Sequence, residues 1–236
     1  MSNSSIKYLD WDSGFFGKKI GRIRFEKPDH LKNLLQIAKS SDYQLIYVFI
    51  NEDSFIEDLI LKQFNGKLVD RKVLFGKEIH TLKEEYKFVS KYKSKQLTPE
   101  LEQLAYESGQ YSRFKLDSNF EQDDFYKMYK IWILKSLTNE MADNLFVVKE
   151  NNVLKGMVTL KIDNEKGHIG LIAVSPDTQS KGYGKALINA CENELLNKGI
   201  TKLEVSTQID NIPACKFYKK CGFEIKEITN IYHFWL

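Results

Sequence analysis

The chain has 236 residues and 42% hydrophobic content, which suffices for one large domain or two small ones with a hydrophobic core. Its 35 basic and 32 acidic residues nearly cancel, and a net charge of +3 is far from the strongly basic balance of a typical nucleic-acid binder. The first nine residues hold no apolar segment of signal-peptide length, and no later run approaches the roughly 18 apolar residues of a membrane span. We therefore expect a soluble cytoplasmic protein that binds neither nucleic acid nor membranes.

The first part of the chain predicts a small α/β unit. An apolar run at 43–50 (YQLIYVFI) predicts a buried strand, and further strands are expected near residues 20–25 and 67–79. Helices are expected after Pro28 and over residues 53–64, where apolar residues recur at helical spacing. In the second helix the residues at helical spacing are Phe55, Ile56, Leu59 and Ile60, and Asp53 is the expected N-cap.

A lysine-rich stretch at 83–95 suggests a linker, although residues 87–92 within it could form the first strand of the second part of the chain. We therefore predict an N-terminal α/β domain over residues 1–84 and a second domain over residues 85–236.

The second domain predicts an α+β layout. A helix should start at Thr98-Pro99-Glu100, with proline at the first helical position, and another should span 123–136. Residues 144–149 and 153–162 predict a hairpin, and 168–174 a third strand. A helix, a strand, a short helix and a final pair of strands complete the predicted order.

The segment 179–185 (QSKGYGK) lies between the third strand and a predicted helix over 186–198. Gly182 and Gly184 let the backbone bend close to a ligand and point amide N–H groups toward it, at the positive end of the helix dipole. The segment fits neither a Walker loop nor a dinucleotide fingerprint. On its own it indicates either a phosphate site or an ordinary turn with a helix cap.

A short helix over 213–221 follows the strand 201–207. Asn211 suits its N-cap, and Gly222 suits the left-handed position after its end. The helix should present three residues on one face: Ala214, Phe217 and Tyr218. Phe217 is expected to pack, whereas the hydroxyl of Tyr218 needs a polar partner.

Three cysteines crowd into the last quarter of the chain, and their odd number and spacing match no disulfide or zinc framework: Cys191, Cys215 and Cys221. The four histidines form no HxxxH pair, so no metal site is expected. Packing explains the cysteines most simply. Cys215 lies in the same predicted short helix as Tyr218, a candidate for catalysis, so a thiol nucleophile is also considered. No histidine lies nearby in sequence to activate it.

Two segments, in order and properly spaced, resemble the paired signature of the GNAT superfamily of N-acetyltransferases: Gln179-x-x-Gly182-x-Gly184 and Asn211-x-x-Ala214-x-x-Phe217-Tyr218-x-x-x-Gly222-Phe223. The resemblance implies the GNAT fold, a mixed and mostly antiparallel central sheet flanked by helices, with acetyl-CoA as the acetyl donor. It also implies a set of cofactor-binding residues: Leu171, Ile172, Ala173, Val174, Gln179, Ser180, Lys181, Gly182, Tyr183, Gly184, Lys185, Asn211, Ala214 and Phe217.

Within this resemblance, the amides of Gly182 and Gly184 would hold the coenzyme A pyrophosphate. The exposed backbone of residues 171–174 would pair with the pantetheine arm like an added strand, and Tyr218 would lie beside the thioester sulfur. A phenol can give its proton to the departing thiolate, so Tyr218 is the expected general acid. The general base is either Glu204 or a chain of waters.

The chain also resembles the two-domain dTDP-fucosamine acetyltransferases, which acetylate a 4-amino sugar on a nucleotide carrier. Four stretches carry this resemblance: Trp11 with Phe15-Phe16-Gly17, Ser112-Arg113-Phe114, Val205-Ser206-Thr207-Gln208 and Tyr232-His233-Phe234-Trp235-Leu236. It implies a dTDP-4-amino-4,6-dideoxyhexose acceptor. The candidate residues for binding it are Ser112, Arg113, Phe114, Thr207 and Gln208.

Alternatives remain for several of these residues. The Arg113 guanidinium matches phosphate oxygens, but the residue could equally be a surface charge or part of a salt bridge. Trp11, Phe15 and Phe16 are expected to pack in the core. The acceptor could also be a protein, a peptide or another small amine, and the chain could be a non-catalytic acyl-CoA-binding module. The sequence leaves a homodimer open.

Overall fold

The computed structural model describes residues 5–25, 28–163 and 165–236. The chain divides into two compact units, one of residues 1–72 with 228–236 and one of residues 73–227. This division differs from the predicted limits of 1–84 and 85–236, chiefly because the end of the chain returns to the first unit. The two longest strands run from one unit into the other, which no local sequence signal indicated.

All elements of the first unit except its last strand precede residue 79, in this order: β1 (Ser5–Tyr8), α1 (Asp10–Phe16), β2 (Ile20–Arg24), α2 (Pro28–Ser40), β3 (Leu45–Asn51), α3 (Asp58–Gln63) and β4 (Gly66–Glu78). The C-terminal strand β10 (Glu224–Trp235) completes its sheet, in the order β1-β2-β3-β10-β4. β3 pairs parallel with β2 and antiparallel with β10. Five of the seven residues of β3 are buried, which confirms the buried strand predicted from residues 43–50.

The helix predicted over residues 53–64 is wrong in its first half. The chain forms a turn closed by the Ser54 amide donating to the Asn51 carbonyl, and α3 starts only at Asp58, with Glu57 rather than Asp53 at its N-cap. Phe55 is 80% exposed, whereas Ile60 is buried in the core. The apolar residues do recur at helical spacing, but a turn follows the end of β3 at Asn51, so the helix begins five residues later than predicted, at Asp58.

The second unit follows the predicted order closely, with these elements: β5 (Val89–Lys91), α4 (Pro99–Ser108), α5 (Arg113–Leu116), α6 (Gln122–Leu137), β6 (Asn144–Glu150), β7 (Val153–Ile162), β8 (Gly167–Val174), η1 (Pro176–Thr178), α7 (Tyr183–Leu196), β9 (Lys202–Gln208) and α8 (Ile212–Lys220). The Thr98 hydroxyl accepts a hydrogen bond from the Leu101 amide (3.3 Å), which confirms the expected start of α4. The short helix α5 was not predicted.

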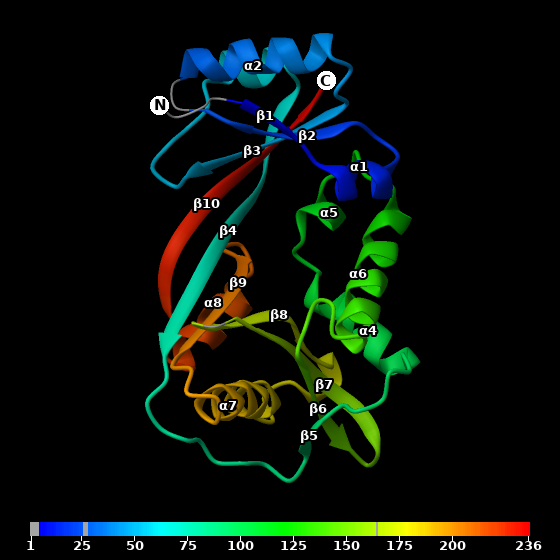
Figure 1. Ribbon diagram of the computed structural model, residues 1–236, viewed down its shortest axis with the longest axis vertical. Coiled ribbons are helices and arrows are strands. Elements are labelled where there is room, and N and C mark those ends of the chain that lie inside the picture. The colour runs from blue at the N-terminus through cyan, green and yellow to red at the C-terminus, as the bar shows by residue number, and fades with distance from the viewer. Residues whose placement is uncertain (1–4, 26–27, 164) are drawn as a thin grey trace. The chain divides into compact units, whose positions relative to one another are not determined.

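The sheet of this unit runs β10-β4-β9-β8-β7-β6-β5. The pairs from β5 to β8 are antiparallel, and β8 pairs parallel with β9, so the predicted mixed and mostly antiparallel GNAT sheet is confirmed. Helices α4 and α6 lie on one side of β6–β8 and α7 on the other (Figure 1). The expected final pair of strands is wrong, because β10 continues as one strand of 12 residues.

Candidate functional site

The strands β8 and β9 separate part of the way along their length. Their parallel pairing covers only residues 167–169 of β8. Residues 172–174 continue to pair with β7 on the other side, but β9 no longer lies against them. This leaves the β9-facing backbone edge of the strand end open to an extended ligand that carries amide groups.

An irregularity in the β7–β8 pairing accompanies this opening. The register shifts between Val158 and Leu160, so Thr159 pairs with Leu145 of β6 but has no register partner on β8. Its hydroxyl instead accepts a hydrogen bond from the buried amide of Leu171 (2.7 Å). Such bulges bend a strand and are frequent next to functional sites. Thr159 lies in an ordinary strand sequence, and only the observed register identifies its role.

The loop after β8 ends in two left-handed backbone turns at the start of α7, beside open space. Ser180 (φ 68°) and Gly182 (φ 82°) both adopt left-handed backbone conformations, and α7 starts directly after them at Tyr183. Space is free around Gly182, where an added Cβ would meet no atom within 4 Å. The first amides of α7 lack partners within the helix, so they can donate to a phosphate in this space.

Gly184 is needed for packing, whatever its backbone amide binds. A Cβ at this residue would lie 3.0 Å from the ring of Phe217. The second glycine therefore permits close packing of α7 against α8, and Phe217 packs as expected. This contact brings the start of α7 and the helix of Tyr218 together.

Glu150, at the end of β6, binds two residues where the segment after β8 meets α7. Its Oε1 accepts hydrogen bonds from Lys181 Nζ (2.8 Å) and from the Tyr183 hydroxyl (2.9 Å). These bonds, the lysine first, lower the pKa of the Glu150 carboxyl, and the bond to Glu150 raises the pKa of Tyr183. Glu150 lies in the β6–β7 hairpin, far from the loop in sequence, so the motif gave no sign of it.

We expect Glu150→Ala to weaken the use of the expected donor, acetyl-CoA, and Glu150→Gln not to weaken it. Alanine removes both bonds and loosens the loop in which Ser180 and Gly182 hold left-handed conformations. KM for acetyl-CoA should therefore rise about three- to tenfold, with kcat little changed. Glutamine keeps an acceptor for Tyr183 and releases the charge of Lys181, so KM should stay equal or fall. Steady-state kinetics with varied acetyl-CoA checks both; a raised KM in the glutamine variant would contradict the positioning role.

Tyr218 is anchored by the ends of α8. Asn211 Oδ1 accepts from the Ala214 amide (3.2 Å), and Gly222 follows the helix with φ 85°, so both predicted caps are confirmed. The ring of Tyr218 is buried, with the rings of Phe75 and Phe223 5.5 and 5.7 Å away. Burial raises the pKa of its phenol, which therefore stays protonated at neutral pH.

The alternative nucleophile Cys215 lacks the surroundings of a reactive thiol. Its Sγ lies 3.4 Å from the carbonyl oxygen of Gln208, to which it donates. Burial raises the pKa of Cys215, so the thiolate is disfavoured. Among the described residues, no group of three or more potential metal ligands lies together.

Glu204 is placed unfavourably for a general base. It lies opposite His168, at the end where β8 and β9 are paired, and its Oε2 is bound to Lys166 Nζ (2.8 Å). Val174, at the open end, lies six residues further along β8, a span of roughly 20 Å. A chain of waters is therefore the better of the two predicted routes for the proton of the amine.

The candidate acceptor residues fall into two places. The Ser112 hydroxyl caps α5 by accepting from the Phe114 amide (3.3 Å), and the guanidinium of Arg113 lies 4.3 Å from the centre of the Phe114 ring. Phe114 itself is buried, so its ring supports Arg113 rather than offering a free face. Thr207 and Gln208 end β9, where Thr207 Oγ1 is 3.4 Å from the side-chain amide of Asn211.

The aromatic residues of α1 only partly follow their expected packing. Phe16 is buried, but Trp11 is 42% exposed and stacks on Phe15 with ring centres 5.0 Å apart.

No helix within the described parts of the chain combines the length and the apolar character needed to cross a bilayer.

Comparison with known proteins identifies both the fold and the chemistry. The family model described as "Acetyltransferase (GNAT) family" matches residues 99–223. An acetyltransferase of Yersinia pestis is 28% identical over 122 residues, which cover 46% of this chain and 86% of that protein.

Solved structures share the fold at low sequence identity. A functionally unknown conserved protein from Staphylococcus epidermidis has a TM-score of 0.66 at 11% identity, over 100% of this chain and 92% of its own. A GCN5-related N-acetyltransferase from Sphaerobacter thermophilus has a TM-score of 0.57 at 14% identity, over 98% and 75%. A fungal region described as a GCN5-related glucosamine N-acetyltransferase has a TM-score of 0.53 at 14% identity, over 98% and 31%.

Proposed function

The chain belongs to the acetyltransferase (GNAT) family, and we propose that it moves the acetyl group of acetyl-CoA to the amine of a nucleotide-linked amino sugar of the dTDP-4-amino-4,6-dideoxyhexose type. Enzymes of this family use acetyl-CoA, so the donor and the reaction class follow from membership. The observation that carries the proposal is the separation of β8 from β9 beside an open anion site at the start of α7. Together they suit an extended amide chain attached to a pyrophosphate.

In this proposal, residues 171–174 pair with the pantetheine arm, and the amides around Gly182 hold the pyrophosphate. Gln179, Ser180 and the two lysines of the loop line the same stretch of cofactor. Asn211 and Ala214 begin the helix that brings Tyr218 to the thioester. These are the binding roles that the resemblance implied.

The proposed chemistry is direct transfer. The uncharged amine attacks the thioester carbonyl and forms a tetrahedral oxyanion, which an amide near Val174 stabilises. The C–S bond then breaks, Tyr218 gives its proton to the departing sulfur, and water takes the proton that the amine loses. The products are the N-acetylated amine and coenzyme A.

The acceptor class rests on the resemblance to the dTDP-fucosamine acetyltransferases and on Arg113. A guanidinium held against an aromatic ring is already oriented, so it loses little entropy when it binds a phosphate. The neighbouring fold described as a glucosamine N-acetyltransferase is compatible with an amino-sugar acceptor.

A panel assay tests the proposal. Release of coenzyme A thiol from acetyl-CoA should be fastest with a dTDP-linked 4-amino-4,6-dideoxyhexose and at least about tenfold slower with glucosamine, a polyamine or a lysine peptide. Faster turnover on a peptide or a free small amine would overturn the acceptor class. Binding of coenzyme A without turnover on any acceptor would favour an acyl-CoA-binding module.

Arg113→Ala should raise KM for the nucleotide sugar about tenfold, because it removes a charge-assisted contact to phosphate. KM for acetyl-CoA should stay unchanged. Lys115→Ala is a matched control, since it removes a positive charge from the same short helix. Equal effects of the two substitutions, or no effect of Arg113→Ala, would count against a phosphate contact at Arg113.

A further inference from the structure

Strand β8 contains one residue more than the part of β7 that lies opposite it. Residues 158–160 of β7 face residues 169–172 of β8, so two steps along one strand match three steps along the other. The extra residue lies at Gly170 or Leu171, directly before the open strand end at 172–174. A β-bulge therefore separates the part of β8 that pairs with β9 from the part that does not.

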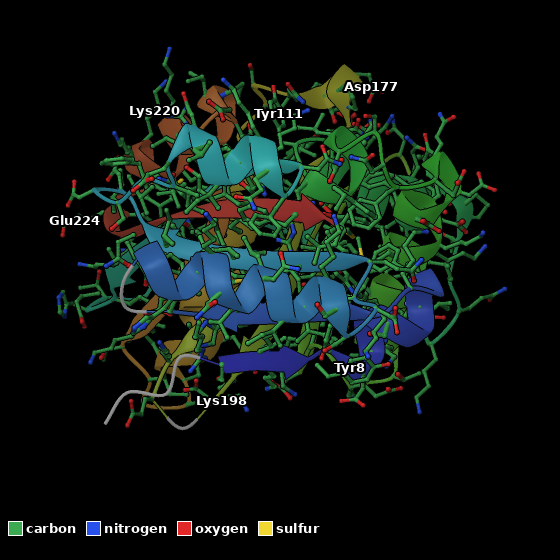
Figure 2. All side chains as sticks on the ribbon, turned by 90° about the horizontal axis from the view of Figure 1, so that it is seen from above. Tyr8, Tyr111, Asp177, Lys198, Lys220 and Glu224 are labelled. Carbon is green, nitrogen blue, oxygen red and sulfur yellow. The ribbon has the colours of Figure 1, made fainter. Side chains whose placement is uncertain are left out.

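The extra residue changes which backbone groups face the open edge. In an antiparallel pair, the N–H and C=O of one residue point to the same edge, and successive residues alternate between the two edges. Without the bulge, each residue of 172–174 would direct toward β7 the groups that it now directs toward the open edge. The chain beyond this strand end comes to the protein surface at Asp177 (Figure 2). The bulge thus determines the pattern of donors and acceptors that an extended ligand meets at this edge.

The side chain of Thr159 stabilises the bulge from the neighbouring strand. Its Oγ1 accepts a hydrogen bond from the Leu171 amide (2.7 Å), and Thr159 is only 2% exposed. Leu171 is buried as well. An amide that is left without an acceptor in a buried place is destabilising, so this hydroxyl favours the bulged register over the regular one.

Gly170 leaves the room that this bond requires. A Cβ at residue 170 would lie 2.9 Å from Thr159 Oγ1, closer than real Cβ atoms approach a neighbour. Gly170 is exposed to solvent and does not adopt a left-handed backbone conformation, so neither burial nor backbone strain calls for glycine here. The threonine and the glycine therefore form one arrangement across β7 and β8.

We propose that Thr159 is a positioning residue for acetyl transfer: its hydroxyl holds β8 in the bulged register and so fixes which amides of residues 172–174 face the pantetheine arm. Thr159 acts through the backbone of β8 and not by contact with the reacting atoms. The inference rests on the proposed pairing of the arm with this strand end, and it is independent of the acceptor.

Calorimetric titration of the full chain compares coenzyme A with 3′-phosphoadenosine 5′-diphosphate, which keeps the pyrophosphate but lacks the pantetheine arm. The unaltered protein should bind coenzyme A at least about tenfold more tightly. Thr159→Val removes the acceptor at nearly constant volume, so it should lose about tenfold in affinity for coenzyme A and stay within about threefold for the fragment. Gly170→Ala should show the same selective loss, because its methyl group displaces the hydroxyl.

Two further variants serve as controls. Thr159→Ser keeps the hydroxyl and should bind both ligands within about threefold of the unaltered protein. Ser136→Ala removes another buried hydroxyl of the same unit, one that donates to the Trp132 carbonyl (2.8 Å). It should also leave both affinities within about threefold, because it lies outside the bulge.

Equal losses for both ligands in Thr159→Val would overturn the inference, and so would a Thr159→Ser variant that behaves like the valine variant. Full preference for coenzyme A in either Thr159→Val or Gly170→Ala would overturn it too. An unaltered protein that binds both ligands equally well would overturn both this inference and the proposed pairing of the arm with β8. Failure of the acceptor panel would leave these results unaffected, because no acceptor is present in the titration.

Discussion

Tyr218→Phe is expected to lower kcat for acetyl transfer about 10²- to 10⁴-fold while leaving the affinity for acetyl-CoA within about threefold. The substitution removes one hydroxyl from a ring that stays packed against Phe75 and Phe223. The loss corresponds to general-acid catalysis, because the departing thiolate would then have to take its proton from water. Stopped-assay turnover and calorimetric binding of acetyl-CoA, on the same preparation, separate the two effects.

Tyr232→Phe is the matched control, because it removes the hydroxyl of another buried tyrosine, on β10. It should leave turnover within about threefold. A loss of acetyl-CoA affinity in Tyr218→Phe equal to the loss of turnover would indicate a binding role, and unchanged turnover would remove the general-acid role altogether.

The pH profile adds a second signature of Tyr218. Burial raises the pKa of its phenol above the ordinary value near 10, so the acid form persists on the alkaline side. Deprotonation of Tyr218 should therefore cause no fall in kcat between about pH 7 and pH 10. A descending limb in that range that disappears in Tyr218→Phe would contradict the raised pKa.

The parts of the site that depend on local backbone were predictable from sequence. Asn211 and Gly222 fix both ends of α8 through their own conformations, and Gly182 takes the left-handed conformation that its position requires. The signals lie within a few residues of their effects. For the same reason the succession of β6, β7 and β8 along the chain followed from alternation and turns.

The parts that depend on distant contacts were not predictable. Glu150 reaches the loop through a hairpin 31 residues earlier than Lys181, and Thr159 acts only through a register shift. Glu204 looked suitable by residue type alone, but its pairing with Lys166 and the strand register place it at the closed end. The end of β10 belongs to the first unit because of pairing with β3, which is about 180 residues away in sequence.

Lys77→Met should destabilise the second unit by about 3–5 kcal/mol. Lys77 Nζ contacts Glu192 Oε1 (2.5 Å) and the carbonyl oxygen of Cys221 (2.6 Å), and the Glu192 side chain is only 1% exposed. Removal of the ammonium leaves a carboxylate buried without its charge partner, which costs far more than the pair itself contributes. It also leaves the carbonyl at the end of α8 without this donor.

The double variant Lys77→Met/Glu192→Met separates the cost of an unpaired buried charge from the net contribution of the ion pair. Because both charges are replaced by apolar groups of similar size, its stability should return to within about 1 kcal/mol of the unaltered protein. Urea unfolding followed by tryptophan fluorescence measures the difference, in a background with Trp11→Phe and Trp235→Phe, so that the signal comes from Trp132 on α6 in the same unit. If the single variant loses less than about 1 kcal/mol of stability, water reaches Glu192 when Lys77 is absent. If the double variant is as unstable as the single one, the two charges specify the packing of α7 against β4.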